Sequence, residues 1–209
     1  MFLQQRRSFL WVLVLLPLLW SANLFAAAAP DQATALVKRT AETILKTLEA
    51  RRAEVERKPA LIYGMIDDIV APHFDFERIT QGALGQAWRQ ATPEQQRLLV
   101  TGFKQVLIRT YARSLLSYSG EEIRYLPSKP GSRPNTVTVA TEVQQPGATP
   151  IPVDYRMHNG SGAWQVYDVV ISDASLVGNY RTTFADDIQK SGIDGLIAKL
   201  NDMNRQGRD

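Results

Sequence analysis

The chain has 209 residues, of which 24 are Lys or Arg and 21 are Asp or Glu, and it has no cysteine. The missing cysteines exclude disulfide bonds, thiolate metal ligands and a cysteine nucleophile. The nearly balanced charge lacks the strong basic excess of nucleic-acid-binding proteins, so nucleic acid is not expected as a partner.

The first 28 residues have the pattern of a secretory signal peptide. Arg6 and Arg7 precede the uncharged apolar run "FLWVLVLLPLLW", and small residues follow up to the alanines at 26–29. We therefore predict that residues 1–28 are removed on export and that residues 29–209 form one domain. The alternative is a retained membrane anchor, although the apolar run is short for a membrane span. The absence of cysteine excludes a lipid-anchored lipoprotein.

The first part of the exported chain is predicted to be helical. Apolar residues at three- and four-residue spacing predict one helix from a cap at Asp31 to about Arg57 and a second over 59–71. A third, short helix is capped by Asp75 and ends at Gly85.

The clearest helix lies in "ATPEQQRLLVTGFKQVLIRTYARSLLSYSG". Thr92 is its N-cap, Pro93 occupies the first turn, Gln95 completes a capping box, and Gly120 ends the pattern. The apolar residues form a single stripe, which comprises Leu99, Phe103, Val106, Leu107 and Leu115, with Tyr111 beside it.

Four strands follow, because the apolar period changes from 3.6 to 2. They are predicted within 121–126, 135–143, 151–158 and 164–171. The first three have one apolar and one polar face, whereas the fourth is apolar on both. Strict alternation in the fourth strand would place Trp164, Val166 and Val170 on one face and Tyr167, Val169 and Ile171 on the other.

The chain returns to helix after Ser172, with a break at Gly192. The order of helices, four strands and helices predicts a single-domain α+β fold. We expect a four-stranded antiparallel sheet with one face covered by the N- and C-terminal helices.

Residues suited to catalysis are few. His73, Asp75 and Glu77 resemble a metal cluster, but Phe74 and Phe76 alternate with them, and we interpret the group as a helix cap with surface charges. Motifs for serine hydrolases, zinc proteases, P-loops and dinucleotide binding are missing from the sequence. We therefore expect no catalytic residue, no metal and no enzymatic activity.

Two further ionisable residues lie on the predicted strands. His158 is placed on the polar face of its strand, beside a turn. Asp168 has apolar neighbours, and we interpret it as a buried structural carboxylate bonded to backbone amides or to an arginine such as Arg181. The apolar helix stripes then either pack closed against the sheet or leave an apolar pocket, and periodicity alone allows both.

Three segments resemble a known family. They are "LGQAWRQATPEQQ" (84–96), "F..VLIRTYARSL" (103–115) and "WQVYDVVISDASLVGNYRTTF" (164–184). The sequence resembles the MlaC family, also known as toluene-tolerance periplasmic proteins, over about residues 32–200. Asp173 stands where the family pattern leads us to expect glycine.

The resemblance implies a soluble, monomeric phospholipid carrier of the periplasm that maintains outer-membrane lipid asymmetry. Its implied partners are an outer-membrane lipoprotein–porin complex and an inner-membrane ABC transporter complex with an MCE-domain subunit. Phospholipid would be cargo, with no cofactor, and its acyl chains would enter an apolar cavity between helices and sheet. The residues we predict to line this cavity are Leu107, Tyr111, Leu115, Tyr125, Val139, Val153, Tyr155, Met157, Tyr167 and Val169.

Two other functions remain open at this point. One is a periplasmic adaptor with a closed core that binds only proteins. The other is a hydrolase of lipid or peptidoglycan that uses Asp168 or His73.

Overall fold

The computed structural model describes residues 24–145, 147–160 and 162–206. Residues 1–23 of the predicted signal peptide lie outside this part of the chain, so its removal stays a prediction. The helices before the sheet are α1 (Leu24–Ala50), α2 (Arg52–Arg57), α3 (Leu61–Ile69), α4 (Phe76–Leu84) and α5 (Pro93–Leu116), with 3-10 turns at Ala71–His73 and Gly85–Arg89. The strands are β1 (Ile123–Tyr125), β2 (Lys129–Pro130), β3 (Thr136–Val143), β4 (Ile151–Asn159), β5 (Trp164–Ile171) and β6 (Ala174–Ser175), and α6 (Leu176–Gln206) follows.

Local capping chemistry fixes several helix ends as predicted. The Asp75 carboxylate accepts a hydrogen bond from the backbone N–H of Arg78 at 2.9 Å and so caps α4. Thr92 and Gln95 form both hydrogen bonds of the capping box that begins α5. Gly192 has a φ of 72° and divides α6 by a kink, which confirms the predicted break.

The first helix differs from the prediction at both ends. Asp31 lies inside α1 and does not cap it, because the helix begins at Leu24 and includes the alanine-rich segment before Pro30. The helix ends at Ala50, and Arg51 becomes the N-cap of the separate helix α2. Between the two helices, the Arg51 guanidinium donates two hydrogen bonds to the Glu54 carboxylate.

The antiparallel sheet has six strands and not the four predicted. The four predicted strands correspond to β1, β3, β4 and β5, and the sheet order is β1-β3-β4-β5-β6 with β2 also paired to β3. The two additional strands have two residues each, too few to show an apolar period. Strand β6 forms because Ser172 and Asp173, with φ of 47° and 66°, turn the chain back onto β5.

A β-bulge in β5 overturns the predicted alternation of that strand. Met157 of β4 pairs with Val166 and Tyr155 pairs with Val169, so two steps along β4 lie opposite three steps along β5. Arg156 faces Asp168, and Tyr167 is the additional residue. Val166 and Val169 therefore lie on the same face of the sheet, which we call the inner face.

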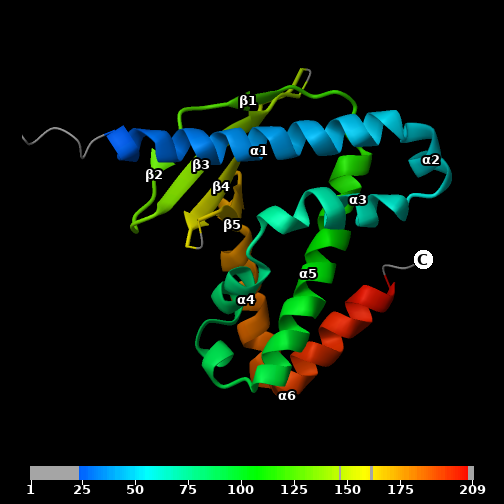
Figure 1. Ribbon diagram of the computed structural model, residues 1–209. Coiled ribbons are helices and arrows are strands. Elements are labelled where there is room, and N and C mark those ends of the chain that lie inside the picture. Colours follow the sequence, from blue (N-terminus) through cyan, green and yellow to red (C-terminus); the bar gives the residue numbers. More distant parts are fainter. Residues whose placement is uncertain (1–23, 146, 161, 207–209) are drawn as a thin grey trace, which may run out of the picture.

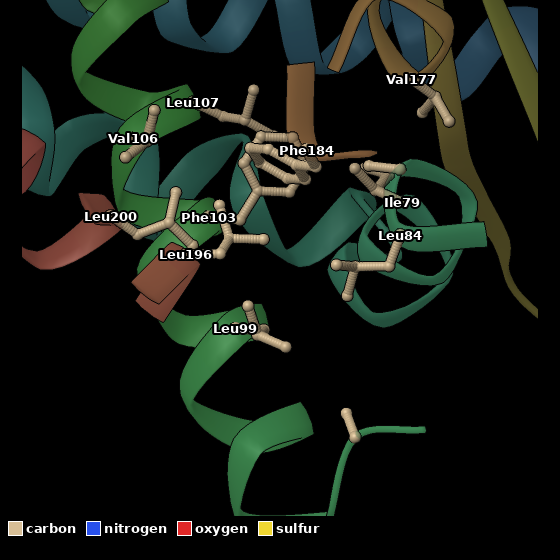
Figure 2. Packing of buried hydrophobic residues seen from close by; sticks show 12 residues of the cluster. Ile79, Leu84, Leu99, Phe103, Val106, Leu107, Val177, Phe184, Leu196 and Leu200 are labelled. Carbon is tan, nitrogen blue, oxygen red and sulfur yellow. The ribbon is translucent and has the colours of Figure 1, made fainter. Parts of the chain in front are cut away.

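Helix α1 crosses the inner face of the sheet, whereas α6 packs mainly on other helices (Figure 1). Ala33 and Val37 of α1 pack in one cluster with Val137, Val139 and Met157 of the sheet. In the helical layer, Phe103 of α5 and Phe184 of α6 meet edge to face with ring centroids 4.9 Å apart. Figure 2 shows this cluster, which continues through Leu196 and Leu200 of α6.

Candidate functional site

Two apolar cavities lie where the helical layer meets the inner face of the sheet. Cavity I has a volume of about 220 Å³ and is lined by Leu36, Val37, Thr40, Ala41, Ile44, Leu45, Val70, His73, Phe74, Leu115, Ile123, Tyr155, Met157 and Val166. Cavity II has a volume of about 240 Å³ and is lined by Ile66, Val70, Ala71, Phe74, Phe76, Ile79, Leu107, Ile108, Tyr111, Leu115, Val153, Tyr155, Asp168, Val169, Ile171 and Leu176.

The two cavities adjoin. Val70, Phe74, Leu115 and Tyr155 line both, so these four side chains form the wall between them. Together the cavities fall within the range of roughly 300–1,000 Å³ that ligand pockets occupy. Asp168 is the one charged residue among the described residues that line them. The space thus suits an apolar ligand.

The structure places seven of the ten predicted residues on the cavity walls, and their contact with lipid stays a prediction. Leu107, Tyr111, Leu115, Val153, Tyr155, Met157 and Val169 are divided between cavities I and II. The stripe of α5 and the inner face of β4 both follow from periodicity, which explains why these positions could be predicted. Val169 lies on the inner face because of the bulge, a geometry that the predicted alternation did not contain.

The other three predicted residues lie elsewhere. Val139 is fully buried under α1, and Tyr125 packs at the edge of the same cluster. Tyr167 lies on the outer face of the sheet, where its ring is 5.9 Å from that of His158 and 5.4 Å from the Arg78 guanidinium carbon. The bulge places Tyr167 there, away from both apolar cavities.

The outer face carries a polar groove of about 990 Å³. Four arginines (Arg78, Arg133, Arg156 and Arg181) and three acids (Asp75, Glu77 and Asp168) are among the residues that line it. Arg181 donates a hydrogen bond from Nε to the carbonyl of Gly82 at 2.8 Å. The groove has a composition opposite to that of the cavities, and we do not assign it to an apolar ligand.

Asp168 has the structural role expected, although with a different arginine. The residue is 4% exposed, and its carboxylate accepts hydrogen bonds from Arg156 Nη1 at 3.0 Å, Ser175 Oγ at 2.7 Å and the Val177 backbone N–H at 3.0 Å. The predicted partner Arg181 is not bonded to it. The bond from Val177 ties β5 to the beginning of α6, whereas Arg156 and Ser175 tie it to the neighbouring strands β4 and β6.

His158 was predicted to face solvent, but it is buried. Its Nε2 atom lies 2.8 Å from Oδ2 of Asp75, the residue that caps α4. Asp75 is 83 positions away in the sequence, which is why strand periodicity could not indicate this contact. Within the described residues, no three His, Asp or Glu side chains gather as a metal site would require.

Most of the lining that the sequence did not single out comes from α1 and from the segment before α4. Val37, Ile44 and Leu45 belong to the apolar stripe of α1, which was predicted only to be buried. Phe74 forms a parallel bridge with Val166, and the backbone N–H of Asp75 donates to the carbonyl of Val166 at 2.9 Å. This contact brings Phe74 beside both cavities. The stripe of α1 was a usable signal, whereas the position of Phe74 depends on tertiary structure.

Burial changes the acidity of two tyrosines on these cavities. Desolvation raises the pKa of Tyr155 to about 12, and the nearby hydroxyl of Tyr125 acts in the same direction. Desolvation also raises the pKa of Tyr111, which is 38% exposed at the edge of cavity II. Both phenols are therefore neutral at physiological pH and can donate a hydrogen bond.

In the part of the chain that the structure describes, none of the helices is both long enough and apolar enough to cross a bilayer. The chain is similar to "Toluene tolerance protein ttg2D" of Pseudomonas putida, with 29% identity over 90% of this chain and 85% of that protein. It is also similar to "Intermembrane phospholipid transport system binding protein MlaC" of Haemophilus influenzae, with 23% identity over 86% of each chain.

A solved structure gives an independent comparison. The phospholipid-binding protein from Ralstonia solanacearum, solved in complex with a phospholipid, has a TM-score of 0.78 and 35% identity to this chain. The match covers 85% of this chain and 99% of the other. The family model described as "MlaC protein" matches residues 38–202, and the chain therefore belongs to the MlaC family.

Proposed function

We propose that this protein is a soluble phospholipid carrier of the periplasm. It would pass lipid between an outer-membrane lipoprotein–porin complex and an inner-membrane ABC transporter complex with an MCE-domain subunit. The observation that carries the proposal is the pair of adjoining apolar cavities between α1, α3, α5 and the inner face of the sheet. The phospholipid complex of the Ralstonia solanacearum protein supports the same ligand class.

The energetics explain why such a carrier is useful. A two-chain lipid exposes about thirty methylene groups to water at roughly 0.8 kcal/mol each, so unassisted transfer costs on the order of 20 kcal/mol. An apolar cavity removes most of this cost without forming or breaking a covalent bond. Lipid transfer therefore needs no cofactor and no catalytic residue.

The lining also suggests what the carrier recognises. Most contacts come from aliphatic and aromatic side chains, which cannot distinguish one headgroup from another. We expect acyl chains to enter the cavities while the headgroup stays outside. Selectivity among headgroups should consequently be weak.

Mass spectrometry of the gently extracted protein tests the function. The protein should be purified from the periplasm of a Gram-negative host without detergent, and its bound lipids identified. A carrier is expected to contain phospholipid, with more than one headgroup represented. A periplasmic adaptor with a closed core would contain none, and that result would end the proposal. The same sample gives the N-terminal sequence of the mature chain, which should begin near residue 29.

A further inference from the structure

Tyr155 has an unusual position in the wall between the cavities. It lies on β4, paired with Val139 on one side and Val169 on the other, and it lines both cavity I and cavity II. The residue is only partly buried by surface area, yet desolvation raises the pKa of its phenol strongly. Tyr155 thus borders the apolar interior of both cavities.

The hydroxyl of Tyr155 has no hydrogen-bond partner among the residues that the structure describes. The Tyr118 hydroxyl, by contrast, donates to the carbonyl of Glu121 at 3.0 Å. The Tyr155 oxygen also differs from Nε1 of Trp164, which is sealed within packed protein. Because Tyr155 lines both cavities, a ligand there can approach its side chain.

An unpaired hydroxyl beside apolar walls is unfavourable, and phenylalanine would pack equally well without it. A hydrogen-bond acceptor on the ligand would offset this cost. In a diacyl phospholipid, the acceptors closest to the acyl chains are the two ester carbonyls.

We propose that the Tyr155 hydroxyl donates a hydrogen bond to an acyl-ester carbonyl of the bound lipid and so selects diester over diether lipids. This inference rests on the proposed function. It assigns Tyr155 a positioning role: the hydrogen bond sets how deeply the acyl chains enter.

Polar groups lie near Tyr155 on this side of the sheet. Tyr125 lies on the same inner face as Tyr155 and is its electrostatic neighbour. Lys38 is an exposed residue of α1, and its ammonium lies 5.9 Å from the centroid of the Tyr125 ring. Glu42 is a second charged neighbour of Tyr125.

The test compares two phosphatidylglycerols with identical chains, one a diester and the other a diether. The delipidated full-length mature protein is titrated with each lipid, and affinities are measured by competition with a fluorescent lipid. Wild type should bind the diester about two- to tenfold more tightly. Tyr155→Phe should lose this preference by weakening diester binding only. Tyr167→Phe, on the outer face of the sheet and in the lining of neither cavity, should keep it.

Carbonyl-labelled diester gives a second readout on the wild-type protein. The ester carbonyl stretch should shift to lower frequency when the lipid is bound, and the shift should disappear in Tyr155→Phe. Equal affinity of wild type for both lipids, or an unchanged preference in Tyr155→Phe, would overturn the inference while leaving lipid binding intact. Failure of both lipids to bind would instead count against the proposed function.

Discussion

Oδ1 of Asp168 accepts a hydrogen bond from the backbone N–H of Val177 at 3.0 Å, so one strand residue caps the helix that follows the sheet. The other carboxylate oxygen, Oδ2, accepts hydrogen bonds from Ser175 Oγ and Arg156 Nη1. Strand β5 and helix α6 are thereby fixed to each other at a buried point. This anchor also borders cavity II, where Asp168 and Leu176 are part of the lining.

Asp168→Ala should destabilise the protein by about 2–4 kcal/mol, because it removes a helix cap and leaves buried donors unpaired. Urea unfolding followed by circular dichroism measures the change. Arg156→Ala is the matched control: the arginine side chain is 44% exposed, so its loss should cost about 0–1 kcal/mol. Equal losses in the two variants would show that the ion pair, and not the cap, dominates.

Leu115→Trp should block lipid binding, because Leu115 lines both cavities. The larger ring fills the space that acyl chains would occupy, and crowding of this kind should weaken phospholipid binding about tenfold or more. Co-purified lipid, quantified by mass spectrometry, is the measurement. Leu98→Trp on the same helix is the control, since Leu98 is 38% exposed and lines neither cavity. Unchanged lipid content in Leu115→Trp would contradict the assignment of the cavities.

Asp173→Gly should stabilise the fold. Asp173 has a φ of 66° in the turn between β5 and β6, a conformation that costs energy for any residue with a Cβ atom. We expect a gain of about 0.5–1 kcal/mol in the free energy of unfolding. Asp173→Ala keeps the Cβ atom and should give no gain, which separates backbone strain from the loss of the carboxylate.

The free energy of unfolding should fall in strong alkali, and ionisation of Tyr155 should cause part of this loss. Its pKa is about 12 in the folded protein against 10.0 for an unperturbed tyrosine. Folding thus favours the neutral phenol, so the contribution is complete below about pH 10 and is lost as the pH rises toward 12. The loss should be on the order of 2–3 kcal/mol at about pH 12.

Urea unfolding of wild type and Tyr155→Phe between about pH 9 and pH 12 checks this pH dependence. The variant should lose less stability over that range. Tyr111, Tyr125 and Tyr180 have raised pKa values as well, so some alkaline loss should remain in the variant. Parallel pH profiles for the two proteins would show that Tyr155 does not titrate with unfolding.

Local signals predicted much of the fold. Thr92, Gln95 and Asp75 act through hydrogen bonds to residues three positions away, and Gly192 acts through its own backbone, so each could be recognised in sequence. The four longer strands followed from their period of two. The two-residue strands β2 and β6 have no period of their own.

The remaining features depend on contacts between distant parts of the chain. The bulge at Tyr167 changes which face Val169 occupies, and no local residue pattern marks it. His158 is buried because α4 folds against its strand, and Phe74 reaches the cavities because it pairs with Val166. The site was predictable where helix stripes and strand faces defined it, as at Leu107 and Tyr155, and not where the bulge or tertiary pairing did.

The two adjoining cavities have a mechanical consequence. Compression favours whichever state of a protein occupies less volume, and internal voids vanish when a chain unfolds. A molecule with empty space between α1, α5 and the sheet should therefore unfold at lower hydrostatic pressure than one whose space is filled by fatty tails. Bound lipid would therefore contribute to the packing of the protein interior as core side chains do.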